Sequence, residues 1–185
     1  MFAGVVLEKT GGESPLAPLE VDFQLGEFHL TGRLERLWPH RQLHYRCAKL
    51  KMKDQMRSWI EHIVLNAMAA SGYPLETTLV MSSDIRNFTA SSGAASHLEK
   101  LLTYYWQGHS RPLHFFPRSS FAYAAKESLD AARKEWRDDT FNRYPGEGSE
   151  PAIRRCFGSA EPFDDEFCSL AVELLKPMLD NSAEG

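Results

Sequence analysis

The strongest constraint on the fold is a change of hydrophobic period between residues 28 and 70. From Phe28 to Leu37 apolar and polar residues alternate, which places successive side chains on opposite faces of a β-strand. From Asp54 to Ala70 the apolar residues recur at the spacing of an amphipathic helix. These helical positions are Met56, Trp59, Ile60, Ile63, Val64 and Ala67.

The segment between these two elements predicts a β-hairpin. The sequence WPHRQ supplies a turn, and a second strand is expected from about Leu43, with Tyr45 and Cys47 on the same face. The apolar parity then shifts to Leu50 and Met52, which indicates a bulge or a break near Ala48. We therefore expect a hairpin that runs directly into the helix.

Later segments extend the same mixed pattern. TTLVMSSD, residues 77–84, predicts a strand, and the apolar residues from Leu98 to Tyr105 predict a helix that ends at GHSRP. Ser119 or Ser120 is expected to cap a helix that begins near Phe121, and Asp164 to cap the final helix. This element order predicts an α+β or three-layer α/β/α domain.

Length and composition set the domain organisation. The 185 residues suffice for one compact domain, which we place over residues 28–185. Residues 1–27 mix Gly, Pro and Ser with short apolar pairs and are expected to form an irregular lead-in. No apolar run approaches the ~20 residues that span a bilayer, so no membrane contact and a cytoplasmic location are expected.

The cysteines and glycines exclude some kinds of site. Cys47, Cys156 and Cys168 have no C-x-x-C spacing, so we expect three buried thiols rather than a disulfide framework or a zinc site. No glycine-rich phosphate loop occurs, and ATP binding by this chain is not expected.

Basic residues are concentrated in one stretch. From Arg33 to Arg57 there are eight basic and two acidic residues, whereas from Glu127 onward fourteen acidic residues face seven basic ones. Such asymmetry can produce a positive face for nucleic acid, although a charged run is also typical of an ordinary solvated surface. The candidate DNA-binding residues are Arg33, Arg36, Arg46, Lys49, Lys51, Lys53 and Arg57.

Glu35 is the one candidate metal ligand on the expected hairpin. Phosphodiester hydrolysis needs at least two acidic ligands for Mg²⁺, but no Asp or Glu occurs from Arg36 to Lys53. We expect Glu35 to form an ion pair with Arg33 or Arg36. His40 and His44 could bind zinc only with a third ligand, so we interpret them as residues of a solvated turn.

A proline-stiffened aromatic segment is the candidate for partner binding. Residues 106–124 read WQGHSRPLHFFPRSSFAYA, with aromatic and basic side chains interleaved. Exposed aromatic and arginine side chains would suit a protein partner or stacking on bases, whereas the alternative is that Phe115 and Phe116 fill the core. Adjacent residues of an extended chain face opposite ways, so both rings are not expected to be buried. The candidate partner-binding residues are Arg111, Leu113, Phe115, Phe116 and Arg118.

Several segments together resemble one family, the C-terminal domain of the exodeoxyribonuclease V gamma subunit, RecC, of the RecBCD helicase-nuclease. They are GRLERLW, KMKDQMRSWIEHIVLNA, LLTYYWQGHSRPLHFFPRSSFAYA, EW, PGEGSEPAIRRCFG and FDDEFCSLAVELLKPML. The resemblance implies a PD-(D/E)XK restriction-endonuclease-like core, with a mixed sheet flanked by helices, that has lost its active site. It also implies DNA and RecB-like and RecD-like subunits as partners, with ATP and Mg²⁺ used by those subunits and no cofactor here.

Active relatives of this fold carry G-x-x-D-R on one strand, D-x-K on the next, and a helix with a Gln. Gly32, Glu35 and Arg36 fit the first motif with Glu for Asp, and Gln55 lies near the start of the helix. The second motif fails, because Arg46 or Ala48 stands where the acid should be. Glu35 is therefore interpreted as the vestige of a catalytic position, and this domain is expected to be inactive.

Three functions stay open from the sequence. The first is a noncatalytic DNA-handling and subunit-docking domain of an ATP-dependent exonuclease and helicase in recombinational double-strand-break repair. The second is a small Mg²⁺-dependent DNA nuclease in which Glu35 recruits Glu27 or Asp84. The third is a module for protein interaction only.

Overall fold

The computed structural model describes residues 2–141 and 144–184, and its contacts divide the chain into two compact units. Residues 1–102 and 180–185 form the first unit, and residues 103–179 form the second. The sequence analysis did not predict this division. None of the helices in the described part of the chain is long and apolar enough to cross a bilayer.

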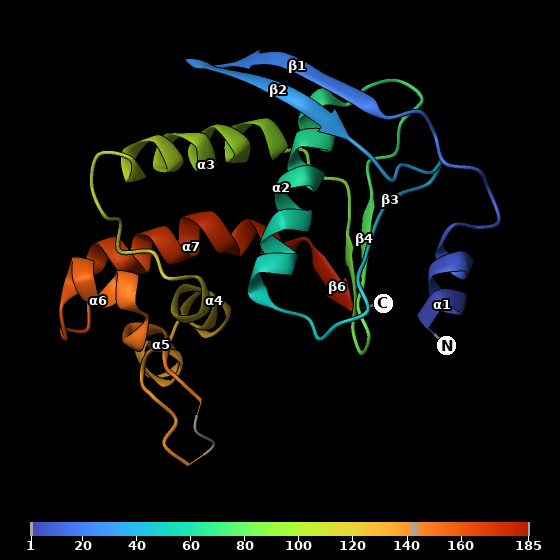
Figure 1. Ribbon diagram of the computed structural model, residues 1–185. Helices are drawn as coiled ribbons and strands as arrows, with labels where there is room; N and C mark the ends of the chain where they lie inside the picture. Colours follow the sequence, from blue (N-terminus) through green and yellow to red (C-terminus); the bar gives the residue numbers. More distant parts are fainter. Residues whose placement is uncertain (1, 142–143, 185) are drawn as a thin grey trace. The chain divides into compact units, whose positions relative to one another are not determined.

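The first unit contains a mixed four-stranded sheet in the order β3-β4-β5-β6 (Figure 1). β3 and β4 are parallel, and the helix α2 connects them, whereas β4 and β5, and β5 and β6, are antiparallel. This confirms the mixed α/β class. The bounds are β3 Gln42–Tyr45, α2 Met52–Met68, β4 Thr77–Val80, β5 Ile85–Phe88 and β6 Ser182–Glu184.

A separate two-stranded hairpin precedes this sheet. β1, Leu19–Leu25, pairs antiparallel with β2, Phe28–Leu34, so that Leu19 lies opposite Leu34. Before the hairpin, Phe2–Lys9 form the helix α1. The expectation of an irregular lead-in over residues 1–27 is therefore wrong, because Leu19 and Val21 are alternating buried positions of a strand that needs a partner.

The hairpin expected between residues 28 and 47 exists only at its tip. Trp38 N donates to Arg41 O at 2.9 Å, and Leu43 N donates to Arg36 O at 2.9 Å. Arg36 has a φ of 56°, in the left-handed region, which turns the chain where the ladder would have to continue. β2 consequently pairs with β1, and β3 pairs with β4, so the predicted pairing is wrong while the turn at residues 38–41 is confirmed.

α2 is confirmed as an amphipathic helix, but its buried face is rotated from the expected one. Trp59 and Ile63 are fully buried as predicted, whereas Ile60 is 41% exposed. Ser58 and His62 are buried in its place. The helix ends at Ala69, which adopts a left-handed conformation and donates its N–H to Leu65 O.

The second unit is helical and is built on an aromatic core. Phe116, Ala132, Trp136 and Phe167 are buried together. The rings of Phe116 and Trp136 meet edge to face with centroids 4.8 Å apart, a geometry that aromatic pairs favour. Its elements are the end of α3 (Ala94–Gly108), α4 (Pro117–Lys126), α5 (Leu129–Trp136), the 3₁₀ turn η1 (Glu147–Ser149), α6 (Pro151–Phe157) and the greater part of α7 (Asp165–Asp180).

Two helix starts in this unit are capped in different ways. Asp164 caps α7 as predicted, since its Oδ1 accepts from Phe167 N at 3.0 Å. α4 begins at Pro117 rather than near Phe121, and neither predicted serine is its N-cap residue. Instead the buried carboxylate of Glu147 accepts from the backbone N–H groups of Arg118 and Ser119, at 2.9 and 2.7 Å. A carboxylate at this position also interacts favourably with the helix dipole.

The expectation of three buried thiols is wrong. Cys47 and Cys156 are exposed, and Cys168 is half-buried. All three are free thiols.

We predict that Gly148→Ala destabilises the protein, because an added Cβ would lie 2.4 Å from Cε2 of the Trp136 indole ring. Overpacking of this kind typically costs about 1–3 kcal/mol of unfolding free energy. Urea unfolding followed by circular dichroism measures the loss. Gly4→Ala is the control, since a Cβ at Gly4 would meet nothing within 4 Å. Equal stability of the two variants would contradict the packing argument.

Candidate functional site

A cleft of about 100 Å³ lies where β3 meets the first turns of α2. Three arginines from separate segments converge on it: Arg36 follows β2, Arg46 follows β3, and Arg57 lies on α2. Its remaining lining residues are His44, Tyr45, Asp54, Ser58, Leu79 and Met81.

Residues two apart on β3 and four apart on α2 bring polar side chains together beside this cleft. Gln42 and His44, two apart on β3, are both buried, and both approach the same carboxylate of α2. Glu61 Oε2 accepts from Gln42 Nε2 at 3.2 Å and lies 3.6 Å from His44 Nε2. Arg57, four residues before Glu61, donates from Nε to Glu61 Oε1 at 3.2 Å.

The cationic side chains of the cleft are only partly neutralised. Arg46 pairs with Asp54, and Arg57 pairs with Glu61. Arg36 has no carboxylate within ion-pair distance among the residues that the structure describes, and its guanidinium lies over the Tyr45 ring at 5.9 Å. Three guanidiniums and two carboxylates therefore leave one positive charge.

His44 is the most unusual group of the cleft. It is 5% exposed, and its Nε2 has no hydrogen-bond partner in the described part of the chain. Burial lowers the pKa of His44 to about 4; Glu61 opposes this shift, while Arg36 and Arg57 add to it. The imidazole is therefore neutral at pH 7, and the tautomer protonated on Nε2 can donate one hydrogen bond.

A chain of buried polar groups lies behind the cleft. His62 Nδ1 is 2.9 Å from Thr77 Oγ1 on β4, and His62 Nε2 is 3.1 Å from Thr89 O, just after β5. Burial lowers the pKa of His62 to about 4, although the hydrogen bond to Thr89 opposes the shift. These bonds fix the rotation of α2 against the sheet.

Glu35 does not line the cleft. Its carboxylate is on the surface and accepts from Arg33 Nη2, which is the ion pair expected from the sequence. Glu27 lies beyond the opposite end of β2, a strand whose seven residues span roughly 20 Å. Within residues 2–141 and 144–184 no three His, Cys, Asp or Glu side chains are arranged to hold a metal ion.

His40 and His44 do not form a common site. His40 is exposed near Glu13, with its Nε2 3.7 Å from Glu13 Oε1, whereas His44 is buried. The interpretation of His44 as part of a solvated turn is therefore wrong. No pattern in the sequence indicated this burial, because the apolar residues Leu43 and Tyr45 place His44 on the opposite face of the strand.

The remaining predicted DNA-binding residues lie outside the cleft. Arg33 is on β2 and pairs with Glu35. Lys49, Lys51 and Lys53 are exposed on the segment that leads from β3 into α2. No described carboxylate lies within ion-pair distance of these three lysines, so their ammonium groups are available to an external anion.

The predicted partner-binding segment is mostly engaged within its own unit. Phe116 is 2% exposed and belongs to the core, whereas Leu113 and Phe115 are half-buried, so the two phenylalanine rings are not both buried. Arg111 pairs with Glu166 at 2.6 Å. Phe116 is thus not accessible to a partner in the folded chain.

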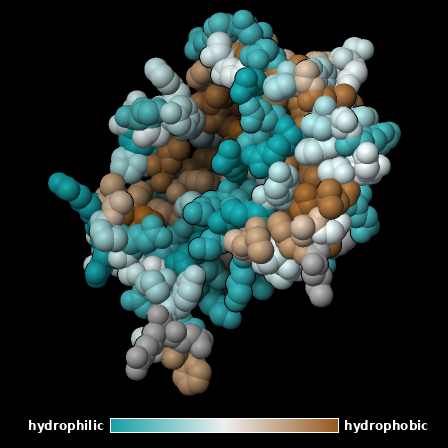
Figure 2. Space-filling view, turned by 45° about the vertical axis from the view of Figure 1, so that its right-hand side comes forward, coloured by the Kyte–Doolittle hydropathy of each residue, from teal (hydrophilic) through white to brown (hydrophobic). Residues whose placement is uncertain are grey.

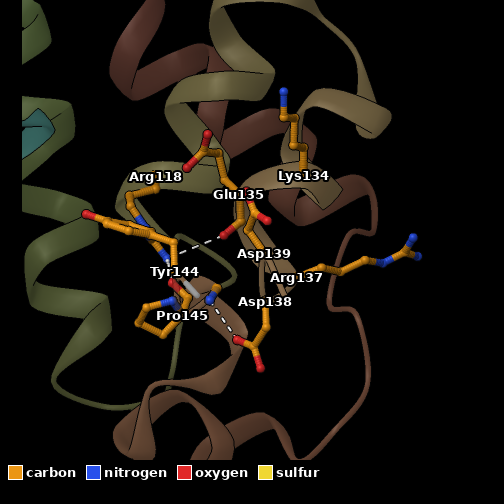
Figure 3. A pocket seen from close by; sticks show the side chains of 9 residues that line it. Arg118, Lys134, Glu135, Arg137, Asp138, Asp139, Tyr144 and Pro145 are labelled. Atoms are coloured by element: carbon orange, nitrogen blue, oxygen red, sulfur yellow. Dashed lines mark hydrogen bonds between the residues drawn. The ribbon is translucent and has the colours of Figure 1, made fainter. Parts of the chain in front are cut away.

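Arg118 also acts inside the second unit. Its Nη2 donates to Pro145 O at 3.1 Å and to Glu135 O at 3.4 Å, and Tyr144 lies against its guanidinium (Figure 3). The adjoining cavity of about 470 Å³ has a mixed lining, and Lys134 and Arg137 point away from each other there. These groups hold the segment before η1 in place and do not converge on a ligand.

Two exposed aromatic side chains were missed as site candidates. Tyr105 and Trp106, near the end of α3, are 67% and 66% exposed. The ring of His109 contacts both, with centroids 4.7 and 6.1 Å away. The sequence signal for exposure was the run of three aromatics, Tyr104 to Trp106, which cannot all face one side of a helix.

The chain is similar to known proteins over most of its length. A family model for the RecC C-terminal domain matches residues 2–128. The RecBCD enzyme subunit RecC of Escherichia coli (strain K12) is 30% identical over 128 residues, which are 68% of this chain and 11% of that subunit. The chain thus spans about a tenth of the length of this relative. The cleft lies within the residues that the family model matches, whereas α5, α6 and α7 lie outside them.

We predict that the unfolding free energy falls as the pH is lowered from 7 to 5. The pKa values of His44 and His62 are about 4 in the folded chain, against about 6.5 when unfolded, so the unfolded chain binds more protons in this interval. Each histidine contributes a slope of up to about 1.4 kcal/mol per pH unit. Urea unfolding at pH 7, 6 and 5 measures it, and His44→Asn should reduce the slope. Identical stability at the three pH values would refute the prediction.

Proposed function

The chain belongs to the RecC C-terminal domain family, and on this premise we propose that it is a noncatalytic DNA-handling and subunit-docking domain. The complex would be an ATP-dependent exonuclease and helicase that acts in recombinational double-strand-break repair. The observation that carries the proposal is the convergence of Arg36, Arg46 and Arg57 at the β3–α2 cleft. The relative's description as a subunit of the RecBCD enzyme is consistent with this role.

The core is proposed to be of the PD-(D/E)XK nuclease-like kind, without its catalytic residues. Support comes from the places of the motif residues: Arg36 derives from the first motif and Arg46 from the second, and both line the cleft. The parallel β3–α2–β4 crossover brings the helix of the third motif beside them. The guanidinium of Arg46 would then stand where active relatives place a carboxylate, while Arg36 matches the arginine of the first motif.

DNA is proposed to meet this domain through its sugar–phosphate backbone. Arginine and lysine bind phosphates without reading the sequence, and Lys49, Lys51 and Lys53 extend the positive surface from the cleft. ATP and Mg²⁺ would be used by partner subunits, in the cytoplasm, and not by this domain. The alternative of a Mg²⁺-dependent nuclease on Glu35 is less favoured, because Glu35 is ion-paired on the surface.

Docking to RecB-like and RecD-like subunits is the second part of the proposal. Tyr105 and Trp106 expose large aromatic surfaces, and such side chains are enriched at the centres of protein interfaces. Half-buried Leu113 and Phe115 follow in the same unit. On the face seen in Figure 2, hydrophobic patches interrupt a largely hydrophilic surface. The third possibility, a module for protein interaction only, would keep this surface and lose the DNA contacts.

We predict salt-sensitive DNA binding that depends on the lysines before α2. With three to five phosphates neutralised, the logarithm of the binding constant should fall against the logarithm of salt with a slope of roughly −3 to −4. Lys51→Glu combined with Lys53→Glu should weaken binding at least about tenfold at low salt. Fluorescence anisotropy with labelled single- and double-stranded DNA, over several salt concentrations, gives both quantities.

The matched control is Lys126→Glu with Lys134→Glu, which makes the same change of charge at exposed positions of the second unit. Equal weakening by both pairs would mean that net charge alone matters. No binding at low salt would favour the interaction-only alternative. DNA cleavage that needs Mg²⁺ and disappears in Glu35→Ala would favour the nuclease alternative.

We also predict that Trp106→Ser weakens assembly with the sister subunits about 5- to 30-fold, since truncation of a buried aromatic anchor typically costs about 1–2 kcal/mol or more. The measurement is the dissociation constant of the reconstituted complex. Leu75→Ser, at another exposed apolar residue, is the control and should leave assembly intact. Unchanged affinity in Trp106→Ser, with normal thermal stability, would remove Trp106 from the docking surface.

A further inference from the structure

The cleft contains a buried hydrogen-bonding group that nothing in the described structure satisfies. His44 Nε2 makes no hydrogen bond in the described structure, although the residue is 5% exposed and lines the cleft, and Glu61 Oε2 is 3.6 Å from it, beyond hydrogen-bond distance. Leaving a buried donor or acceptor unpaired is unfavourable by about 1–3 kcal/mol. A site that persists with such a group is expected to receive a partner from outside the chain.

The neighbouring cations also keep unused donors. Each guanidinium has five N–H groups in a planar fork. Arg57 uses Nε for Glu61, and Arg36, which has no carboxylate partner in the described residues, is oriented by the Tyr45 ring. The carboxylate nearest to His44, that of Glu61, is bonded to Arg57 and Gln42 and does not line the cleft. Asp54 does line it, but its charge is offset by Arg46.

The size and chemistry of the cleft limit its ligand. About 100 Å³ is well below the roughly 300–1,000 Å³ of pockets that enclose drug-sized molecules. A small anion with several acceptor oxygens suits guanidinium donors that converge from separate segments and one imidazole donor. Arg57 and Ser58 lie on the second turn of α2, one turn beyond Asp54.

We propose that this cleft binds one backbone phosphate of a DNA strand, with Arg36 and Arg57 donating to its oxygens and His44 Nε2 donating a third hydrogen bond. This inference rests on the proposed function, because that function supplies DNA as the source of the phosphate. The arginines take the electrostatic role that metal ions have in active nucleases, where the ions bind the phosphate and also generate the attacking hydroxide. Arginine does only the first, so the strand is held without being cut.

The test combines nuclear magnetic resonance with binding measurements on the 185-residue chain. In the unsubstituted protein, titration with a short DNA duplex or single strand should shift the imidazole ¹⁵N signals of His44, and an equal concentration of inorganic phosphate should shift them far less. This readout needs no variant, so it is independent of any folding defect. A shift with phosphate but none with DNA would overturn the proposal, as would no shift with either.

The variants Arg36→Gln and Arg57→Gln each remove one proposed phosphate ligand. Each should weaken DNA binding about five- to tenfold and make the salt slope about 0.9 less steep. The matched control is Arg155→Gln, which removes the same charge at an exposed position of α6, outside the cleft and outside the candidate DNA-binding residues. Its effect on affinity should stay below about twofold.

The outcomes separate this inference from the proposed function. DNA binding that Arg36→Gln and Arg57→Gln leave unchanged, without a shift of His44, would overturn the phosphate site and leave the DNA-handling role standing. Absence of DNA binding by the unsubstituted chain at low salt would overturn both. Equal losses of affinity in the cleft variants and in Arg155→Gln would show that only net charge matters and would overturn the site.

Discussion

The geometry of the cleft depends on how His62 joins α2 to the sheet. This fully buried imidazole contacts Thr77 on β4 and the carbonyl of Thr89, and it stacks on Trp59 at 5.2 Å. Residues three and four apart share one side of a helix, so fixing His62 also fixes the direction of Ser58. With the helix held in this rotation, Arg57 lines the cleft. Glu61, one residue before His62, contacts Gln42 and approaches His44 on β3.

The same interaction explains what the hydrophobic pattern could and could not predict. The extent of α2 followed from periodicity, but the buried face did not, because Ser58 and His62 take the inward positions and Ile60 is exposed. A buried polar side chain is tolerated when it finds partners, and those of His62 are 15 and 27 residues away along the chain. Periodicity counts apolar residues and contains no information about such pairs. The occurrence of the cleft arginines was visible in sequence, whereas their convergence depended on this rotation.

Sequence patterns predicted a helix cap or a turn correctly where the interacting residues are close together in the sequence. They failed where the interacting residue is far away along the chain. Asp164 caps α7 from three residues before Phe167, and the turn at residues 38–41 closes on itself, and both were predicted. The cap of α4 comes from Glu147, 28 residues beyond Ser119, and it was missed. The prediction of strand pairing was wrong for the same reason. The left-handed conformation of Arg36 ends the pairing with the following strand, and β2 pairs instead with β1, which lies in the expected lead-in.

A site built on arginine differs physically from one built on carboxylates and a metal. Carboxylates repel one another until an ion binds, so their affinity for phosphate depends on the ion, whereas guanidinium groups carry a permanent charge. Crowded guanidiniums also repel, and the pairs Arg46–Asp54 and Arg57–Glu61 relieve that repulsion when no anion is present. Because those pairs are partly exposed, solvent and salt weaken them, and an incoming phosphate can share the same arginines without first breaking a buried ion pair. The cleft is thereby suited to repeated, salt-sensitive contact with a moving strand rather than to permanent retention of one ligand.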